Sequence, residues 1–296
     1  MELIKNPNFD FIGKRKIMYL VSLCVIIAGI ISFVKRGKGN FGVDFTGGDI
    51  LHLEFNQKVN ALEIRRMLKD LKIANFTVQI LGREGREVII RSSPGTSDTI
   101  LSFMKQKVGE KNLILKGKSI ISPSMSKTLI RKAILAFAWG LIGILFYITI
   151  RFEFRFAVGA TIAIFHDLLV VLSILTLLKK QIDTTVIAAL LTIAGYSVND
   201  TVVVFDRIRE NLKRTRSTDY FNIFNRSINE TLSRTILTSL TTLFVVFCIF
   251  FFGGEALHTF SLALIAGFIT GTYSSIFIAS SLLIDWHRVK PHRFKL

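Results

Sequence analysis

Cysteine is scarce in this sequence, and its scarcity excludes a fold held together by disulfide bonds. The chain has 2 cysteines among 296 residues. Cys24 and Cys248 both fall inside long apolar segments, where we expect them to serve as packing residues. Clusters of histidine, cysteine or paired carboxylates, which hold metal ions, are missing from the one long polar region. We therefore expect no metal, no cofactor and no catalytic site.

Acidic residues are also few, and their shortage points to a membrane protein rather than to a nucleic-acid partner. Aspartate and glutamate number 21 against 38 lysines and arginines, a formal net charge of +17. The basic residues are spread over the connections between apolar segments, without the interleaved aromatic residues of a nucleic-acid surface. Their placement is typical of the positive-inside pattern of membrane proteins.

The glycine-rich stretch NFGVDFTGGDI, residues 40–50, lacks the marks of a phosphate-binding loop. It contains neither Gly-Lys-Ser/Thr before a helix nor a GxGxxG turn after a strand. Its spacing favours a turn that joins a membrane helix to a strand, because Gly42, Gly47 and Gly48 allow backbone angles that other residues resist.

Long apolar runs, by contrast, are abundant. Half of the residues are hydrophobic and the mean hydropathy is +0.49, which is too apolar for a soluble domain. A run of about 18 apolar residues crosses a hydrocarbon core of about 30 Å as a helix. Six segments meet this criterion: residues 17–34, 133–150, 156–178, 184–205, 235–252 and 258–284. The first has no small-residue cleavage site after a short core, so we expect a retained anchor.

The basic residues predict the orientation of these segments. They gather in the N-terminal segment, between the second and third apolar segments, in the fourth connection and in the tail, which places both termini in the cytoplasm. Lys179 and Lys180 lie on the opposite side and count against this topology without outweighing it. The predicted organisation has four parts: the cytoplasmic N-terminus and first helix (1–36), an extracytoplasmic domain (37–128), a five-helix membrane domain (129–286) with a cytoplasmic loop (206–234), and a basic cytoplasmic tail (287–296).

The polar region 37–128 shows the alternation of strands and helices in the order βαββαβ. The predicted strands are residues 50–55, 77–81, 87–92 and 112–121, and the predicted helices are 60–72 and 97–109. This order suits a small ferredoxin-like sandwich that binds or handles a partner. The predicted fold is therefore a polytopic α-helical membrane protein with six transmembrane helices and one α+β ferredoxin-like extracytoplasmic domain between helices 1 and 2.

Carboxylates lie inside the apolar segments, where they are costly. Asp167 follows His166 near the middle of the third segment, and Asp200 lies in the fourth. A charged side chain at the bilayer centre costs about 2.5–3.5 kcal/mol, so such residues serve a function by default. We interpret Asp167 and Asp200 as a proton relay, with His166 in support. The sequence leaves open whether Asp200 carries protons itself or only orients Asp167.

The neighbouring polar residues have structural explanations as well. For Asn199 a hydrogen bond between helices accounts for the residue as readily as a role in the relay. For Asp206 and Arg207, close to the cytoplasmic boundary, an interfacial ion pair or a helix-end contact is favoured.

Small residues predict where membrane helices approach closely. Gly267 and Gly271 lie four residues apart in the sixth segment, and Gly195 continues a polar stripe of the fourth. Glycine lets two backbones approach in lipid, so we expect all three residues to pack against a helix, in this chain or in a partner.

Five blocks resemble, in this order and spacing, signature blocks of the SecF family of bacterial protein export, across nearly the whole chain: FGVDFTGGD, FHD, GYSVNDTVVVFDRIREN, SRTILTSLTTL and GFITGTYSSIFIASSLL. The resemblance implies membership of the proton-driven RND superfamily, with the six helices pairing with six of a separate SecD subunit around a pseudo-twofold axis. It also implies that the two subunits use the proton motive force to pull a preprotein from the SecYEG channel after the ATP-driven SecA step.

The resemblance carries over to particular residues and partners. Asp167 matches the intramembrane aspartate of the family's HD element, and Asn199, Asp200, Asp206 and Arg207 match its NDT and FDR polar set. The implied partners are SecD, SecYEG, the translocating preprotein, membrane lipid and protons, with YajC and YidC as further candidates and no nucleic acid. The implied location is the bacterial cytoplasmic (inner) membrane. The alternative is a stand-alone proton-coupled solute exporter of the RND type, although such pumps have large outer loops in both halves. In either case we expect a transport protein and not an enzyme.

Overall fold

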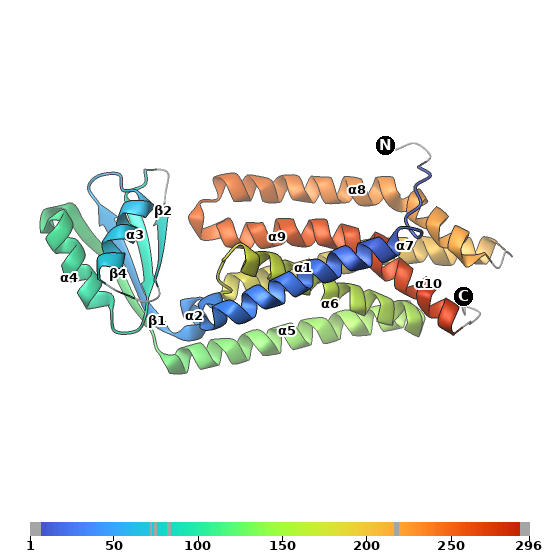
Figure 1. Cartoon of the computed structure of the whole chain (residues 1–296), viewed down its shortest axis with the longest axis horizontal. Helices are drawn as coiled ribbons and strands as arrows, with labels where there is room; N and C mark the ends of the chain where they lie inside the picture. Colours follow the sequence, from blue (N-terminus) through green and yellow to red (C-terminus); the bar gives the residue numbers. More distant parts are fainter. Residues whose placement is uncertain (1–6, 72, 74–75, 82–83, 216–218, 291–296) are drawn as a thin grey trace.

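The computed structural model describes residues 7–71, 73, 76–81, 84–215 and 219–290. Long helices run side by side as a bundle, and a small domain with a sheet lies beyond one end of it (Figure 1). Helix α1 leads from the bundle toward this domain, and helix α5 leads back from it (Figure 1).

Within the described residues, six helical spans are long and apolar enough to cross a membrane, as predicted. Their helices are α1 (Arg15–Arg36), α5 (Pro123–Arg151), α6 (Phe154–Leu177), α7 (Thr184–Arg214), α8 (Tyr220–Phe252) and α9 (Glu255–Ser274), the last continuing through a π-helical turn (Ser275–Ala279) into α10 (Ser280–Val289). In that turn the Ser280 hydroxyl donates to the Ser275 carbonyl oxygen, five residues back, at 3.0 Å.

The prediction of a loop over residues 206–234 is wrong for most of its length. Helix α7 continues to Arg214, and α8 already begins at Tyr220. The charges that suggested a loop are spaced at helical intervals: Glu210 pairs with Arg207 at i,i+3 and with Arg214 at i,i+4. Such pairs stabilise a helix as it leaves the apolar layer.

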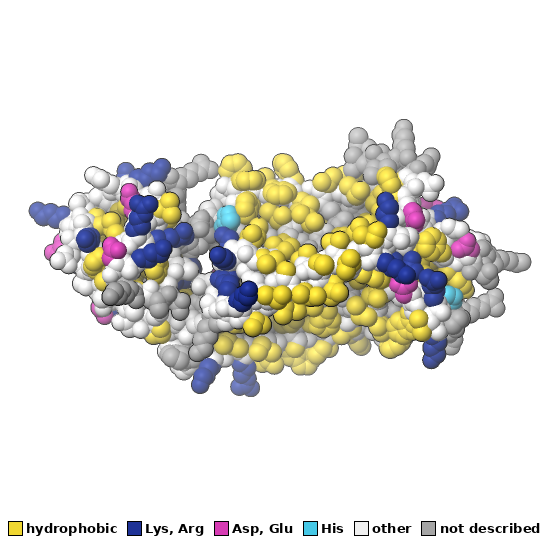
Figure 2. All heavy atoms as spheres, in the orientation of Figure 1, with side chains coloured by type: hydrophobic (Ala, Val, Ile, Leu, Met, Phe, Trp, Pro, Cys, Tyr) yellow, Lys and Arg dark blue, Asp and Glu magenta, His cyan; other side chains and the backbone are white. Residues whose placement is uncertain are grey.

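Helices α6, α7 and α9–α10 form the inside of the bundle. In the 18-residue apolar segment of each of these spans, 56 %, 50 % and 72 % of the residues are buried, whereas in α1, α5 and α8 the buried share is 17 % at most. On the face drawn in Figure 2, hydrophobic side chains cover the middle of the bundle, and lysines and arginines gather toward its two ends. Cys24 and Cys248 are free and exposed, so the expectation that they are packing residues is wrong. Both lie on the outer helices, where an apolar side chain meets the membrane or a partner.

The small domain has the predicted βαββαβ order. Its elements are β1 (Gly48–Phe55), α3 (Ala61–Asp70), β2 (Phe76–Leu81), β3 (Glu87–Ser92), α4 (Ser97–Val108), a 3₁₀ turn (Glu110–Asn112) and β4 (Leu113–Ile121). The strands are antiparallel in the order β2-β3-β1-β4, which is the ferredoxin-like arrangement. Leu51 and Leu53 of β1 pack with Ile64 of α3 and Ile100 of α4, so both helices cover one face of the sheet. His52, on the other face, pairs with Glu87 at 2.8 Å.

The glycine-rich stretch connects the bundle to the sheet, as its spacing predicts. A 3₁₀ turn (Gly37–Asn40) and the short helix α2 (Val43–Thr46) lie between α1 and β1. Gly47 has a φ of 74°, which favours glycine, and a Cβ on Gly48 would overlap the Ser92 carbonyl oxygen. The two glycines thus let the chain turn directly from α2 into the central strand.

Candidate functional site

Asp167 joins the three inner helices of the bundle. It lies on α6 and is fully buried. Its Oδ2 accepts hydrogen bonds from the Ser197 hydroxyl of α7 at 2.5 Å and the Ser274 hydroxyl of α9 at 2.7 Å. Its Oδ1 lies 2.9 Å from Nδ1 of His166. Asp167 therefore faces a helix interface and not lipid.

His166 extends this cluster toward α1. Its ring stacks on Tyr273 of α9, with the ring centroids 6.1 Å apart, and the Tyr273 hydroxyl donates to the Met18 carbonyl oxygen at 2.7 Å and meets the Ser22 hydroxyl at 3.0 Å. Nε2 of His166 is buried and has no hydrogen-bond partner within the described part of the chain. A buried polar atom without a hydrogen-bond partner is costly.

Asp200 lies in a second cluster, which joins α7, α8 and α9. The carboxyl group is buried, and the Thr272 hydroxyl donates to its Oδ2 across a long 3.5 Å. Thr272 also contacts the Ser239 hydroxyl of α8 at 2.5 Å, and Tyr196 donates to Ser239 at 3.3 Å. Asp200 is thus held more loosely than Asp167.

The two clusters share helices α7 and α9. Ser197 and Asp200 lie three residues apart on α7, and Thr272 and Ser274 lie two apart on α9. A Cβ on Gly271 would contact Ser197 at 3.3 Å, and one on Gly267 would overlap Ile193. These two glycines therefore pack α9 closely on α7, within this chain.

Gly195 and Asn199 face outward instead. Apart from its own chain neighbours and the local backbone of α7, no described atom lies within 4 Å of the position that a Cβ on Gly195 would take, so the expected packing of Gly195 is not realised within the described chain. Asn199 is exposed and, with Gly195, lines a surface groove between α5 and α7 beside Trp139. Neither residue joins the clusters of Asp167 and Asp200.

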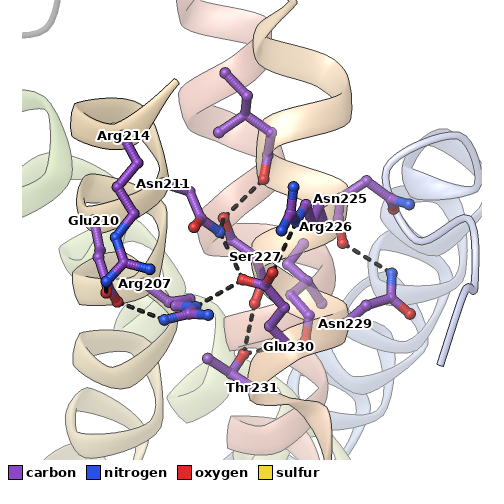
Figure 3. Close-up of polar contacts among 12 residues, drawn as sticks. Arg207, Glu210, Asn211, Arg214, Asn225, Arg226, Ser227, Asn229, Glu230 and Thr231 are labelled. Atoms are coloured by element: carbon purple, nitrogen blue, oxygen red, sulfur yellow. Dashed lines mark hydrogen bonds and ion pairs between the residues drawn. The ribbon is translucent and has the colours of Figure 1, made fainter. Parts of the chain in front are cut away.

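Asp206 and Arg207 form ion pairs, though not with each other. Arg151 of α5 pairs with Asp206 at 3.0 Å, and Arg207 pairs with Glu230 of α8 at 2.7 Å. Arg207 and Arg226 converge on Glu230 (Figure 3), and the Asn211 side chain donates to the same carboxylate at 2.7 Å. The two predicted residues thus fasten α7 to α5 and α8 at the end of the bundle, away from the buried carboxylates.

Comparison with known proteins decides the family. The family profile described as "Protein export membrane protein SecD/SecF, C-terminal" matches residues 102–289. The protein translocase subunit SecF of Thermodesulfovibrio yellowstonii is 45 % identical over 291 residues, covering 96 % of each chain. SecF of Calditerrivibrio nitroreducens is 40 % identical over 294 residues, again covering 96 % of each. The chain belongs to the SecD/SecF family.

A solved structure of the family has the same fold. The crystal structure of SecDF, a translocon-associated membrane protein from Thermus thermophilus, matches with a TM-score of 0.82 at 35 % identity. The match covers 97 % of this chain but 40 % of the SecDF chain, so this SecF-like chain spans less than half of that protein. The resemblance found in the sequence is therefore confirmed, and the protein is a multi-pass membrane protein of the translocase-subunit type rather than an enzyme.

Several contributors to the site of this SecD/SecF family member were not found by sequence reasoning. Ser197 and Ser239 look like ordinary bundle residues, and only the fold brings Ser197 to Asp167 and Ser239 to Thr272, which lies beside Asp200. Asn225 and Asn229 were also missed: their side-chain oxygens accept from backbone N–H groups of the N-terminal segment at 2.9 Å. Their spacing of four residues was the available signal.

Proposed function

We propose that this chain is the SecF-type subunit of a bacterial protein-export machine. With SecD it uses the proton motive force to complete preprotein translocation through SecYEG, after the ATP-dependent SecA step. Near full-length similarity to proteins named translocase subunit SecF supports the assignment to export. The observation that carries the mechanism is the pair of buried carboxylates, Asp167 and Asp200, on helices that pack around α9.

Protonation of these carboxylates would change how the helices are joined. An ionised carboxylate accepts hydrogen bonds only, whereas a protonated one also donates. At Asp167 this change affects contacts with two other helices at once. Moving one charge through the membrane potential supplies about 2.3 kcal/mol per 100 mV, enough to shift a conformational equilibrium roughly fiftyfold. In this proposal Asp200 exchanges the proton and Asp167 converts it into a change of helix packing.

The proposed setting is the bacterial inner membrane with both termini in the cytoplasm and residues 37–128 outside. The basic residues near the N-terminus and in the tail support this orientation. The groove between α5 and α7, with the exposed Asn199 and Gly195, supports docking of a SecD helix there. YajC and YidC are candidate partners of the assembled complex.

The test compares Asp167→Asn with a matched control on α7. Asparagine keeps the size of the side chain but cannot titrate, so the variant should assemble with SecD and retain ATP-driven export while losing the stimulation by a proton gradient. Asp206→Asn removes a carboxylate from a surface ion pair and should export normally. The measurement is preprotein uptake into membrane vesicles with and without a proton gradient. Full gradient-driven uptake by Asp167→Asn would refute the assignment of Asp167.

A further inference from the structure

The glycine-rich stretch does more than turn the chain, because it pairs with the segment that links α6 to α7. The Gly42 N–H donates to the Ile182 carbonyl oxygen at 2.8 Å, and the Ile182 N–H donates to the Asn40 carbonyl oxygen at 2.7 Å. Phe41 and Ile182 thereby form a parallel β-bridge. Two segments 141 positions apart in the sequence are thus tied together backbone to backbone.

Asp44 fastens this pairing to the beginning of α7. Its Oδ2 accepts from the backbone N–H of Thr184 at 3.1 Å and from the Thr184 hydroxyl at 2.8 Å. Thr184 is the first residue of α7, where backbone N–H groups lack partners within the helix and a negative charge is favoured. The helix already has a cap of its own, since Asp183 accepts from the Val186 N–H at 3.0 Å. Asp44 therefore adds a second carboxylate to the same helix end from a different part of the chain.

The stretch is also fixed on the α1 side. The Arg36 guanidinium donates to the carbonyl oxygens of Thr176, Lys180 and Lys179 at 3.2–3.4 Å. The Asn40 side chain donates to the Phe33 carbonyl oxygen at 2.7 Å. Arg36 thus ties the end of α1 to the end of α6, and Asn40 holds the stretch against α1.

The other end of the stretch leads straight into the sheet. Helix α2 ends at Thr46, and Gly48 already belongs to β1, which pairs with both β3 and β4 at the centre of the sheet. Helix α7 carries Asp200 sixteen residues after Thr184, about 24 Å along a helix. A continuous helix moves as a unit, so displacement at the carboxylate reaches Asp44.

We propose that residues 40–48 are the joint that transmits movement of α7 to the outer domain, with Asp44 as the positioning residue that holds the joint on the helix. This inference rests on the proposed function, because it assigns a route from the buried carboxylates to the domain that would act on the preprotein. If Asp44 only stabilised the start of α7, its loss should have the same effect as the loss of Asp183. Asp183 caps the same helix end but makes no hydrogen bond to the stretch through this cap.

The experiment measures proton flux and export separately in the full complex with SecD. Asp44→Ala should keep proton flux within about twofold of wild type while gradient-driven export falls about tenfold, the effect of losing one strong helix-end contact. Asp183→Ala is the matched control, because it weakens the helix end but not the joint. In this variant any change in proton flux should be accompanied by an equal change in gradient-driven export. Equal loss of export in the two variants, or normal export by Asp44→Ala, would overturn the joint.

A covalent link should rescue the uncoupled variant. Bridged strands lie about 4.8 Å apart, within the Cα separation of about 4.4–6.8 Å that a disulfide accepts. In a Cys24→Ser, Cys248→Ser background, Phe41→Cys with Ile182→Cys added to Asp44→Ala should restore export when oxidised and lose it on reduction. Export that does not respond to oxidation of a disulfide shown to have formed would count against the joint.

A third readout does not depend on export. Spin labels on the exposed positions Lys69 of α3 and Thr192 of α7 report the distance between the outer domain and the helix. In Asp44→Ala the distance distribution should broaden, whereas in Asp183→Ala it should not. An unchanged distance distribution in Asp44→Ala would overturn the joint, whether or not export depends on protons. Failure of the proposed function would appear differently, as export by the wild-type protein that does not respond to the proton gradient.

Discussion

At the scale of the residue, Asp167 and Asp200 differ in how firmly their carboxylates are held. Asp167 meets three side chains at 2.5–2.9 Å, whereas Thr272 approaches Asp200 only to 3.5 Å. A firmly held group transmits a change in its surroundings, and a loosely held one can exchange a proton without breaking strong contacts. The sequence marked both carboxylates but could not show how firmly each one is held.

We expect Asp200→Asn to insert and assemble normally but to lower proton flux about a hundredfold, the usual contribution of a group that transfers a proton. The measurement is uptake of protons by proteoliposomes that contain the complex with SecD. Thr272→Val, which removes the long hydrogen bond to Asp200 but leaves the carboxyl group, should reduce flux much less. Flux at the wild-type rate in Asp200→Asn would remove Asp200 from the relay.

Asp49 makes the stability of the outer domain depend on pH. It is buried and its Oδ2 accepts from the Ser97 N–H, at the start of α4, at 2.8 Å. Burial by itself raises the pKa of the Asp49 carboxyl, but hydrogen bonds from Ser97 and the turn before it lower that pKa below its usual value. Because the folded-state pKa is lowered, the contribution to stability is complete above the unfolded pKa of about 3.9 and is lost as pH falls through the folded value.

Hydrogen exchange of the α4 amides in the full chain measures this effect. Protection in the wild type should fall as pH drops below about 4, and Asp49→Ala should lower the free energy of opening by about 1–2 kcal/mol at neutral pH. Asp49→Asn keeps an acceptor but cannot titrate, so its protection should lack the acid-dependent fall. The same acid dependence in all three proteins would place its origin elsewhere.

At the scale of the element, the packing of α9 on α7 controls both carboxylate clusters. Gly271 sits against Ser197, which donates to Asp167. A larger side chain at position 271 must push α7 away, because the contact is already at van der Waals distance. The sequence did not decide whether Gly271 packs against a helix of this chain or of a partner, and the structure shows that it packs against α7 of this chain.

Gly271→Leu should destabilise the isolated chain by about 1–3 kcal/mol, the cost of overpacking a close interface. It should also reduce proton flux, although no titrating group has changed. Gly195→Leu is the matched control, because that position faces open space in this chain. We expect it to leave thermal stability in detergent unchanged and to weaken binding of SecD. Wild-type stability of Gly271→Leu would show that α7 and α9 can separate freely.

At the scale of the whole molecule, the outer domain and the bundle have separate cores, and the chain joins them twice, through the stretch before β1 and between β4 and α5. The cluster of Leu51, Ile64 and Ile100 contains no residue of the bundle core. Deleting residues 37–128 would remove Asn40 and Asp44 together with the sheet, and would confuse loss of the domain with loss of the joint.

Replacing residues 49–121 by a short flexible linker separates these effects. Binding of SecD and proton flux should persist, because the bundle core and the contacts of Asp44 remain. Gradient-driven export should fall to the level without a gradient, because nothing outside the membrane receives the movement. Co-purification, proton flux and preprotein uptake measure the three properties. Normal uptake without the sheet would show that the outer domain does not act on the preprotein.

The sequence by itself determined the six membrane spans and the βαββαβ order of the outer domain. Both follow from local properties, namely the length of apolar runs and the periodicity of side chains between caps. It also singled out Asp167 and Asp200, since a carboxylate within an apolar run is conspicuous without any fold.

Only the tertiary structure decided which residues meet. Ser274 is 107 positions from Asp167, and Thr184 is 140 positions from Asp44, so no local pattern indicates either contact. The local sequence also gives no sign that Gly195 faces outward, because a glycine in a membrane helix is typical of a packing position. Hydropathy and periodicity depend on neighbours along the chain, whereas the contacts between distant residues depend on how whole helices pack. This packing makes Asp167 a firm link between helices and leaves Asp200 loosely held.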